Sequence, residues 1–130
     1  MNSKLPDKEK RSGVEGNALY RYYKSFINAV HGIVYAIRYE HNFIIIVTAI
    51  FVTTVLGFLF NISTTEWAII VICFGLVSAC ELINSSIEAC VDLVSLKHTP
   101  LGKIAKDCAS GATLIFSIMS LIVAIIIFIF

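Results

Sequence analysis

One helical face of this chain carries polar side chains of types that can do chemistry. It consists of Glu81, Asn84, Glu88 and Asp92, which follow one another at intervals of three or four residues. On a helix that turns about 100° per residue, they fall within roughly 80° of one another. Such a stripe of carboxylates and an amide could bind a divalent cation, act as a general base toward a hydroxyl group, or carry protons through a membrane. The residue types leave these three chemistries open.

The composition makes charges in this chain costly. The sequence is 58% hydrophobic and 15% charged, whereas soluble domains are roughly 45–50% apolar, so we expect a membrane protein. A charge at the bilayer centre costs at least ~2.5–3.5 kcal/mol, so the acidic groups should face the interior of a helix bundle and serve a function. The alternative, that they only join helices by hydrogen bonds, suits Asn84 and Ser85 better than three carboxylates on one face.

Two runs without charge are long enough to span a bilayer, residues 43–60 and 112–130, and a third, residues 67–80, is short but becomes long enough when the polar stretch up to Val94 is included. We therefore expect three membrane-spanning helices, at residues 43–60, at residues 65–94 and within residues 103–130. The second of them is about 45 Å long, so its last turns, with Glu88 and Asp92, should emerge beyond the hydrocarbon. The third is expected to begin with a shorter leading helix near Lys103.

Upstream of these spans, over residues 17–40, apolar residues recur at intervals of three and four, and the basic residues lie largely on another face. This pattern predicts an amphipathic helix lying on the membrane surface. A helix packed on a soluble partner is the alternative. Residues 1–16 have no periodicity and are predicted to be a disordered tail, and residues 95–102 are predicted to be a loop. The expected fold is an all-α membrane protein with one domain over residues 17–130.

The basic residues indicate the orientation. All ten Lys and Arg lie before the first span or between the second and third spans. The positive-inside rule therefore places the N-terminus and residues 95–111 in the cytoplasm, and the Asn61–Glu66 connection outside. On the cytoplasmic side Lys106 and Asp107 lie across a short loop from Glu88, and Lys106 could meet a phosphate. An ordinary positive-inside lysine is the alternative, and Glu40 could complete an acidic cluster with Glu88.

Several familiar catalytic motifs are absent from the sequence. No G-x-x-x-x-G-K-[ST] phosphate loop, no H-E-x-x-H pair and no Ser/His/Asp arrangement is present. A P-loop enzyme is therefore excluded, and the candidate chemistry remains with the polar stripe and the lysine that follows it.

The pattern E-x-x-N-x-x-x-E-x-x-x-D over Glu81 to Asp92, followed by Ala105-Lys106-Asp107 and Gly111-Ala112, resembles the signature of the small prokaryotic diacylglycerol kinase and undecaprenol kinase family. The resemblance covers about residue 21 to the C-terminus. The segments around Glu40 and Trp67 look more like the Gram-positive undecaprenol kinase branch.

The resemblance implies a homotrimeric bundle in the bacterial cytoplasmic membrane, with cytoplasmic sites shared between subunits. It implies a lipid alcohol and ATP as substrates, Mg²⁺ as cofactor, and no nucleic-acid partner. Glu81 would be the general base, and Glu40 and Glu88 would be the magnesium carboxylates that also contact ATP. The remaining nucleotide and phosphate contacts would come from Asn84, Asp92, Lys106 and Asp107.

This sequence departs from the family pattern at some positions. Lys97-His98-Thr99 replaces commoner acidic, tyrosine and histidine residues, which affects the expected contacts to the nucleotide base. Asn28 stands where many relatives have tyrosine. Ile46 lacks an acidic side chain of the Gram-negative lipid kinases, which favours undecaprenol over diacylglycerol as substrate.

The leading hypothesis is therefore an undecaprenol kinase, with a diacylglycerol kinase as the alternative within the family. A small proton-coupled exporter using Glu81 is the alternative from another class. It would leave Lys106 and Asp107 without a role, and a non-catalytic membrane scaffold would leave still more unexplained.

Overall fold

The computed structural model describes residues 18–94 and 99–130, and all secondary structure within them is helical. The helices are α2 (Ala18–Tyr39), α3 (His41–Phe60), α4 (Thr64–Val94) and α5 (Pro100–Ile129). Of these, α3, α4 and α5 are long and apolar enough to cross a membrane. The predicted all-α class with three spans is confirmed. The predicted tail at 1–16 and the Lys97-His98 part of the loop lie outside the described residues.

The start of α5 differs from the expectation, because the helix begins at Pro100 and continues without a break to Ile129. Thr99 has extended backbone angles, and its Oγ1 accepts a hydrogen bond of 3.1 Å from the Gly102 amide. A threonine cap followed by proline at the first helical position is a favoured way to start a helix, because the proline has no amide hydrogen to leave unsatisfied. One long helix therefore replaces the expected leading helix and span.

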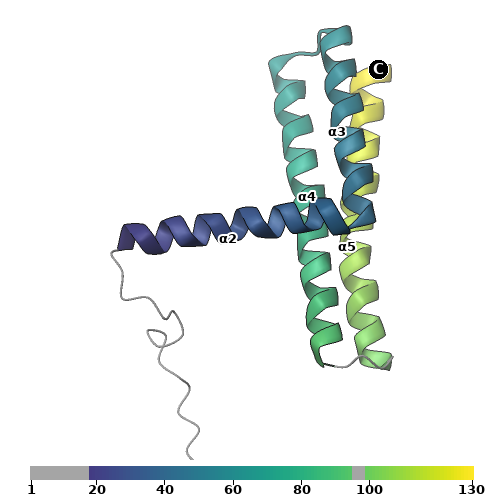
Figure 1. Ribbon diagram of the computed structural model, residues 1–130. Helices are drawn as coiled ribbons and strands as arrows, with labels where there is room; N and C mark the ends of the chain where they lie inside the picture. Colours follow the sequence, from purple (N-terminus) through teal and green to yellow (C-terminus); the bar gives the residue numbers. More distant parts are fainter. Residues whose placement is uncertain (1–17, 95–98) are drawn as a thin grey trace, which may run out of the picture. The chain divides into compact units, whose positions relative to one another are not determined.

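The two longest helices, α4 and α5, run antiparallel and pack against each other more extensively than α3 packs against either. At 1.5 Å per residue α4 and α5 are each about 45 Å long, whereas α3 is about 30 Å long. Figure 1 shows α3 beside the half of the pair that contains the C-terminus and the α3–α4 turn. The end of α4 and the start of α5 therefore extend beyond α3.

The turn between α3 and α4 is fixed by capping interactions. Asn61 adopts a left-handed conformation (φ 51°), and the amides after α3 return to the Gly57 and Phe58 carbonyls. Glu66 Oε2 accepts hydrogen bonds from the Ser63 amide (2.6 Å) and hydroxyl (2.7 Å), and the Glu66 amide donates to Ser63 Oγ at 3.3 Å. This is a capping box, in which donors at the helix start are satisfied reciprocally.

Aromatic packing closes the bundle near this turn. The Trp67 ring lies so close to Gly57 that a Cβ on the glycine would be 2.7 Å from it. The Phe58 and Trp67 rings are 5.1 Å apart between centroids, and Phe60 meets Phe128 of α5 at 5.8 Å. Trp67 therefore joins α3 to α4.

Few side chains of the isolated chain are buried. The buried apolar residues among those described are Ala36, Phe43, Ile46, Ile70, Val77 and Ala109. Most large apolar side chains are exposed, including many on α3, α4 and α5. A core of this size does not suit a soluble domain, and the exposed apolar faces match a lipid environment or contacts with other chains.

Helix α2 exposes aromatic side chains near its start. Leu19, Tyr20, Tyr22, Tyr23 and Phe26 are all more than half exposed. Large apolar side chains exposed together are a usual property of surfaces that contact a membrane or another protein.

Candidate active site

The polar stripe on α4 is buried at one end and open at the other. Glu81 is 1% exposed and Asn84 is 5% exposed. Glu88 is half-buried, and the side chain of Asp92 is 54% exposed. The stripe covers about 16 Å along the helix axis, because each residue advances 1.5 Å. It therefore connects a dry interior position with the exposed end of α4.

Glu81 is the deepest group of the stripe, and both of its carboxylate oxygens are buried without a hydrogen-bond partner in the described chain. It lines a cavity of about 230 Å³ whose other polar side chains are Asn42, Ser110, Thr113 and Ser117. The Thr113 hydroxyl is also buried and without a partner there. Because leaving a buried polar group unpaired costs free energy, such a cluster is typical of a site that a ligand completes.

The next two members of the stripe contact each other. Asn84 Nδ2 donates a hydrogen bond of 3.2 Å to Glu88 Oε1, one helical turn away. This bond orients the Glu88 carboxylate and fixes the Asn84 amide. Asn84 Oδ1 is buried and has no partner among the described residues. The pair thus offers carboxylate and amide oxygens to a further ligand.

An ion pair joins the open end of the stripe to α5. Lys106 Nζ lies 2.6 Å from Asp92 Oδ1, and both side chains are partly exposed. One turn earlier, Lys103 pairs with Asp107 at 3.3 Å along the same helix. Lys106 and Asp107 are adjacent in sequence, and adjacent residues on a helix do not face each other. Exposed ion pairs are worth about 0–1 kcal/mol, so the Lys106 ammonium can exchange Asp92 for a phosphate at little cost.

Glu40 lies directly before α3 with its carboxylate unused by the helix. Its amide donates to the Ala36 carbonyl at 2.9 Å and its carbonyl accepts from the Phe43 amide at 3.1 Å, but its side chain makes no capping hydrogen bond. No contact between Glu40 and Glu88 is found in the described part of the chain. Residues 18–94 and 99–130 contain no group of three or more His, Cys, Asp or Glu that could hold a metal ion.

The available oxygens nevertheless suit Mg²⁺ bound together with a nucleotide. Magnesium in such sites usually keeps several waters and takes one or two carboxylates, while substrate phosphates supply the rest. Three groups are ligands of this type. They are the Glu88 carboxylate, the Asn84 Oδ1 atom, which has no partner among the described residues, and the Glu40 carboxylate, which makes no capping hydrogen bond.

Sequence reasoning missed residues of α5 and α3 that line the cavity beside Glu81. Thr113 is the main one, with Asn42 across the same cavity, whereas Ile46, which also lines it, was noted above for its lack of an acidic side chain. The small residues Ala109 to Ala112 indicate a close helix approach next to Thr113, and Ala109 is buried in the structure. A threonine in an apolar run is not distinctive, because Thr48 and Thr54 on α3 merely bond back to their own helix.

Comparison with known proteins identifies the family. The family model described as prokaryotic diacylglycerol kinase matches residues 27–128. An undecaprenol kinase of Bacillus subtilis is 42% identical over 112 residues, which cover 86% of this chain and 91% of that protein. A diacylglycerol kinase of Synechocystis is 38% identical over 101 residues, or 76% of this chain and 57% of that protein. A diacylglycerol kinase of Pseudomonas aeruginosa is 41% identical over 81 residues, or 62% of this chain and 66% of that protein.

The match covers the polar stripe, the Lys106–Asp92 pair and all three spans, and a relative above 40% identity extends over most of both chains. The three long apolar helices agree with a multi-pass membrane protein. This chain therefore belongs to the prokaryotic diacylglycerol kinase family and is an ATP-dependent lipid kinase.

Proposed function

We propose that this lipid kinase transfers the γ-phosphate of ATP to undecaprenol, and that Glu81 is the general base. The observation that carries the proposal is the Glu81 carboxylate, which is buried beside a cavity between the helices and has no hydrogen-bond partner in the part of the chain that the structure describes. A membrane-embedded carboxylate of this kind is the group that a lipid hydroxyl needs. Glu81 accepts the hydroxyl proton while the alcohol oxygen bonds to the γ-phosphorus and the bond to the ADP oxygen breaks.

The nucleotide binds from the open end of the stripe, where Glu88 and Asp92 lie about 10 and 16 Å from Glu81 along the helix axis, and its triphosphate extends toward Glu81 so that the γ-phosphate meets the lipid hydroxyl. Lys106 leaves Asp92 for the phosphates, and Asn84 orients Glu88. Asp92 and Asp107 complete the nucleotide shell, and Glu40 and Glu88 are the magnesium ligands. Mg²⁺, when bound, neutralises charge on the ATP phosphates. Positioning and charge neutralisation are the main requirements of phosphoryl transfer, so the absence of a phosphate loop from the sequence is no obstacle.

The protein works as a homotrimer with sites shared between subunits, in the bacterial cytoplasmic membrane. Two observations support sharing: the exposed apolar faces of α3 to α5, and the lack of a contact between Glu40 and Glu88 within the described chain. The distribution of Lys and Arg supports a cytoplasmic N-terminus and active site, with α2 on the membrane surface.

The substrate is tested by purifying the protein in lipid nanodiscs and measuring label transfer from γ-labelled ATP to undecaprenol and to diacylglycerol, with Mg²⁺ and with a chelator. We expect undecaprenol to have the larger kcat/KM and the chelator to stop transfer. A preference for diacylglycerol would overturn the substrate assignment. That outcome has some support, because two of the relatives compared are named diacylglycerol kinase.

A further inference from the structure

Two adjoining cavities lie between α3 and the α4–α5 pair. The first is the polar one around Glu81. The second, of about 220 Å³, extends from it toward the Trp67 end of the bundle and is lined mainly by apolar side chains. Both are lined by Ile45, Ile46 and Ser117, so the apolar space begins where the Glu81 site ends.

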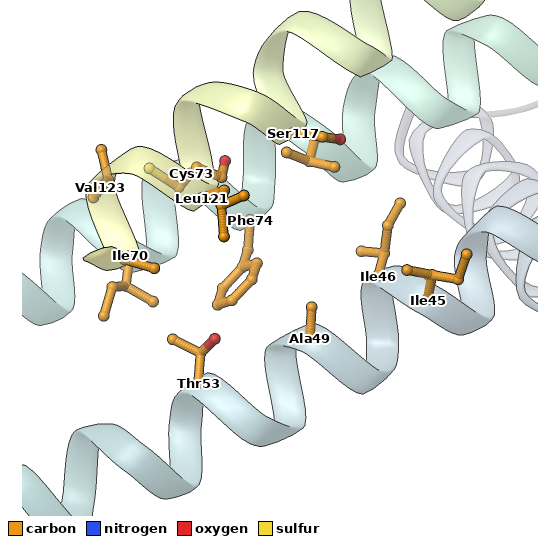
Figure 2. A pocket seen from close by; sticks show the side chains of 13 residues that line it. Ile45, Ile46, Ala49, Thr53, Ile70, Cys73, Phe74, Ser117, Leu121 and Val123 are labelled. Carbon is orange, nitrogen blue, oxygen red and sulfur yellow. The ribbon is translucent and has the colours of Figure 1, made fainter. Parts of the chain in front are cut away.

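The apolar cavity exists because α3 presents short side chains at the height where α4 and α5 present large ones. Figure 2 shows Ala49 and Thr53 pointing from α3 toward Phe74 and Leu121 across an open space. At one end of α3 the gap is closed by Trp67 against Gly57. The cavity is therefore a channel between helices whose width depends on Ala49 and Thr53.

The two cavities together define the chemistry of a ligand. At the polar end, the Glu81 oxygens need a hydrogen-bond donor, and the Thr113 hydroxyl needs a partner of either kind. A hydroxyl group supplies a donor and an acceptor in one atom. The other cavity suits an apolar chain, because a polar ligand there would lose its hydrogen bonds to water.

We propose that the channel between α3 and the α4–α5 pair holds the first part of the tail of the lipid alcohol, with its hydroxyl between Glu81 and Thr113. This inference rests on the proposed function and adds the path of the tail. The tail lies inside one subunit, and Ala49 and Thr53 set the room for it. A channel of about 220 Å³ suits an alcohol with one chain better than a glycerol with two diverging chains, so the channel selects for a prenyl alcohol.

The test fills the channel and compares two lengths of substrate. The variant is Ala49→Phe, and the matched control is Val47→Phe on the same helix, where Val47 is 46% exposed and does not line the channel. KM and kcat are measured for undecaprenol and for a prenyl alcohol of a single isoprene unit, which ends before Ala49. We expect Ala49→Phe to raise KM for undecaprenol about tenfold or more, with the short alcohol and the control unchanged.

Equal behaviour of Ala49→Phe and Val47→Phe on both alcohols would overturn the channel proposal while leaving the kinase assignment intact. Failure of the wild-type protein to phosphorylate either alcohol would instead overturn the proposed substrate. Because Ala49→Phe could disturb folding, a second measurement uses the wild-type protein and an undecaprenol with a photoreactive group in its second isoprene unit. Crosslinks to the Ala49–Thr53 stretch or to Phe74 support the proposal. Crosslinks confined to other faces of the helices, or to a side chain of a second copy, contradict it.

Discussion

The two ends of the α3–α4–α5 bundle differ in how completely their polar groups are hydrogen-bonded within the chain. At the turn between α3 and α4, Ser63 and Glu66 cap each other and Trp67 fills the space over Gly57. In the half that contains Glu81, carboxylate, amide and hydroxyl atoms are buried without hydrogen-bond partners among residues 18–94 and 99–130. The first end is held by contacts within the chain, whereas the second buries polar atoms for which the described residues offer no partner.

This contrast separates stability from function within one small bundle. Closed packing at the Trp67 end holds α3 against α4, and this leaves α3 and α5 free to enclose an incomplete polar site further along. Substitutions at the Glu81 end should change activity more than stability, and substitutions at the Trp67 end should do the opposite.

Of the three substitutions at Lys106, Asn84 and Gly57, the one at Lys106, the lysine at the open end of the stripe, should have the largest effect. Lys106→Met removes the cation that is proposed to meet the ATP phosphates, and we expect kcat/KM for ATP to fall about 10²–10³-fold. Lys103→Met is the matched control, because Lys103 belongs to the same helix and also pairs with an aspartate. Its kcat/KM should change by less than about threefold. Equal losses in both variants would show that Lys106 acts through general charge alone.

A smaller effect is expected at Asn84, which is more deeply buried than Lys106. Asn84→Ala removes the amide that donates to Glu88 at 3.2 Å, and activity should fall about 10–100-fold with a higher Mg²⁺ requirement, because the carboxylate loses its orienting partner. The control is Ser85→Ala, whose hydroxyl bonds to the Glu81 carbonyl of the same helix. A magnesium titration of both variants checks this, and an unchanged midpoint for Asn84→Ala would contradict the role given to Asn84.

At the closed end, the effect should appear in stability. Gly57→Ala places a methyl group 2.7 Å from the Trp67 ring, so we expect a loss of about 1–3 kcal/mol in the free energy of unfolding and near-normal activity per folded molecule. Gly75→Ala in α4 is the control, because a Cβ there meets nothing within 4 Å. Denaturation in mixed micelles measures both variants. A large loss of activity in folded Gly57→Ala protein would remove the distinction between the two ends.

The sequence predicts the features that depend on periodicity and composition. Intervals of three and four residues put Glu81 and Asn84 on one face, and both are buried. The apolar runs also predict the three spans, because length and hydrophobicity are local properties of the sequence. The start of α5 was missed although its signal, Thr99 before Pro100, was present in the sequence.

Features that depend on the register between helices could not be predicted. The partner of Lys106 is Asp92 because of how α5 lies along α4, and no spacing within either helix specifies that alignment. The same holds for Thr113, which matters because it lines the same cavity as Glu81. The close contact between Gly57 and Trp67 likewise depends on how α3 and α4 align. Contacts between subunits, including any meeting of Glu40 and Glu88, remain a prediction.

The central claim is that the buried Glu81 carboxylate receives the proton of a lipid alcohol. The most direct test compares label transfer from γ-labelled ATP to undecaprenol by the wild-type protein and by Glu81→Gln, with nucleotide binding measured on the same samples. The account predicts a fall in kcat of about 10²–10⁴-fold in Glu81→Gln, with ATP affinity and thermal stability retained. Full activity of Glu81→Gln would contradict it.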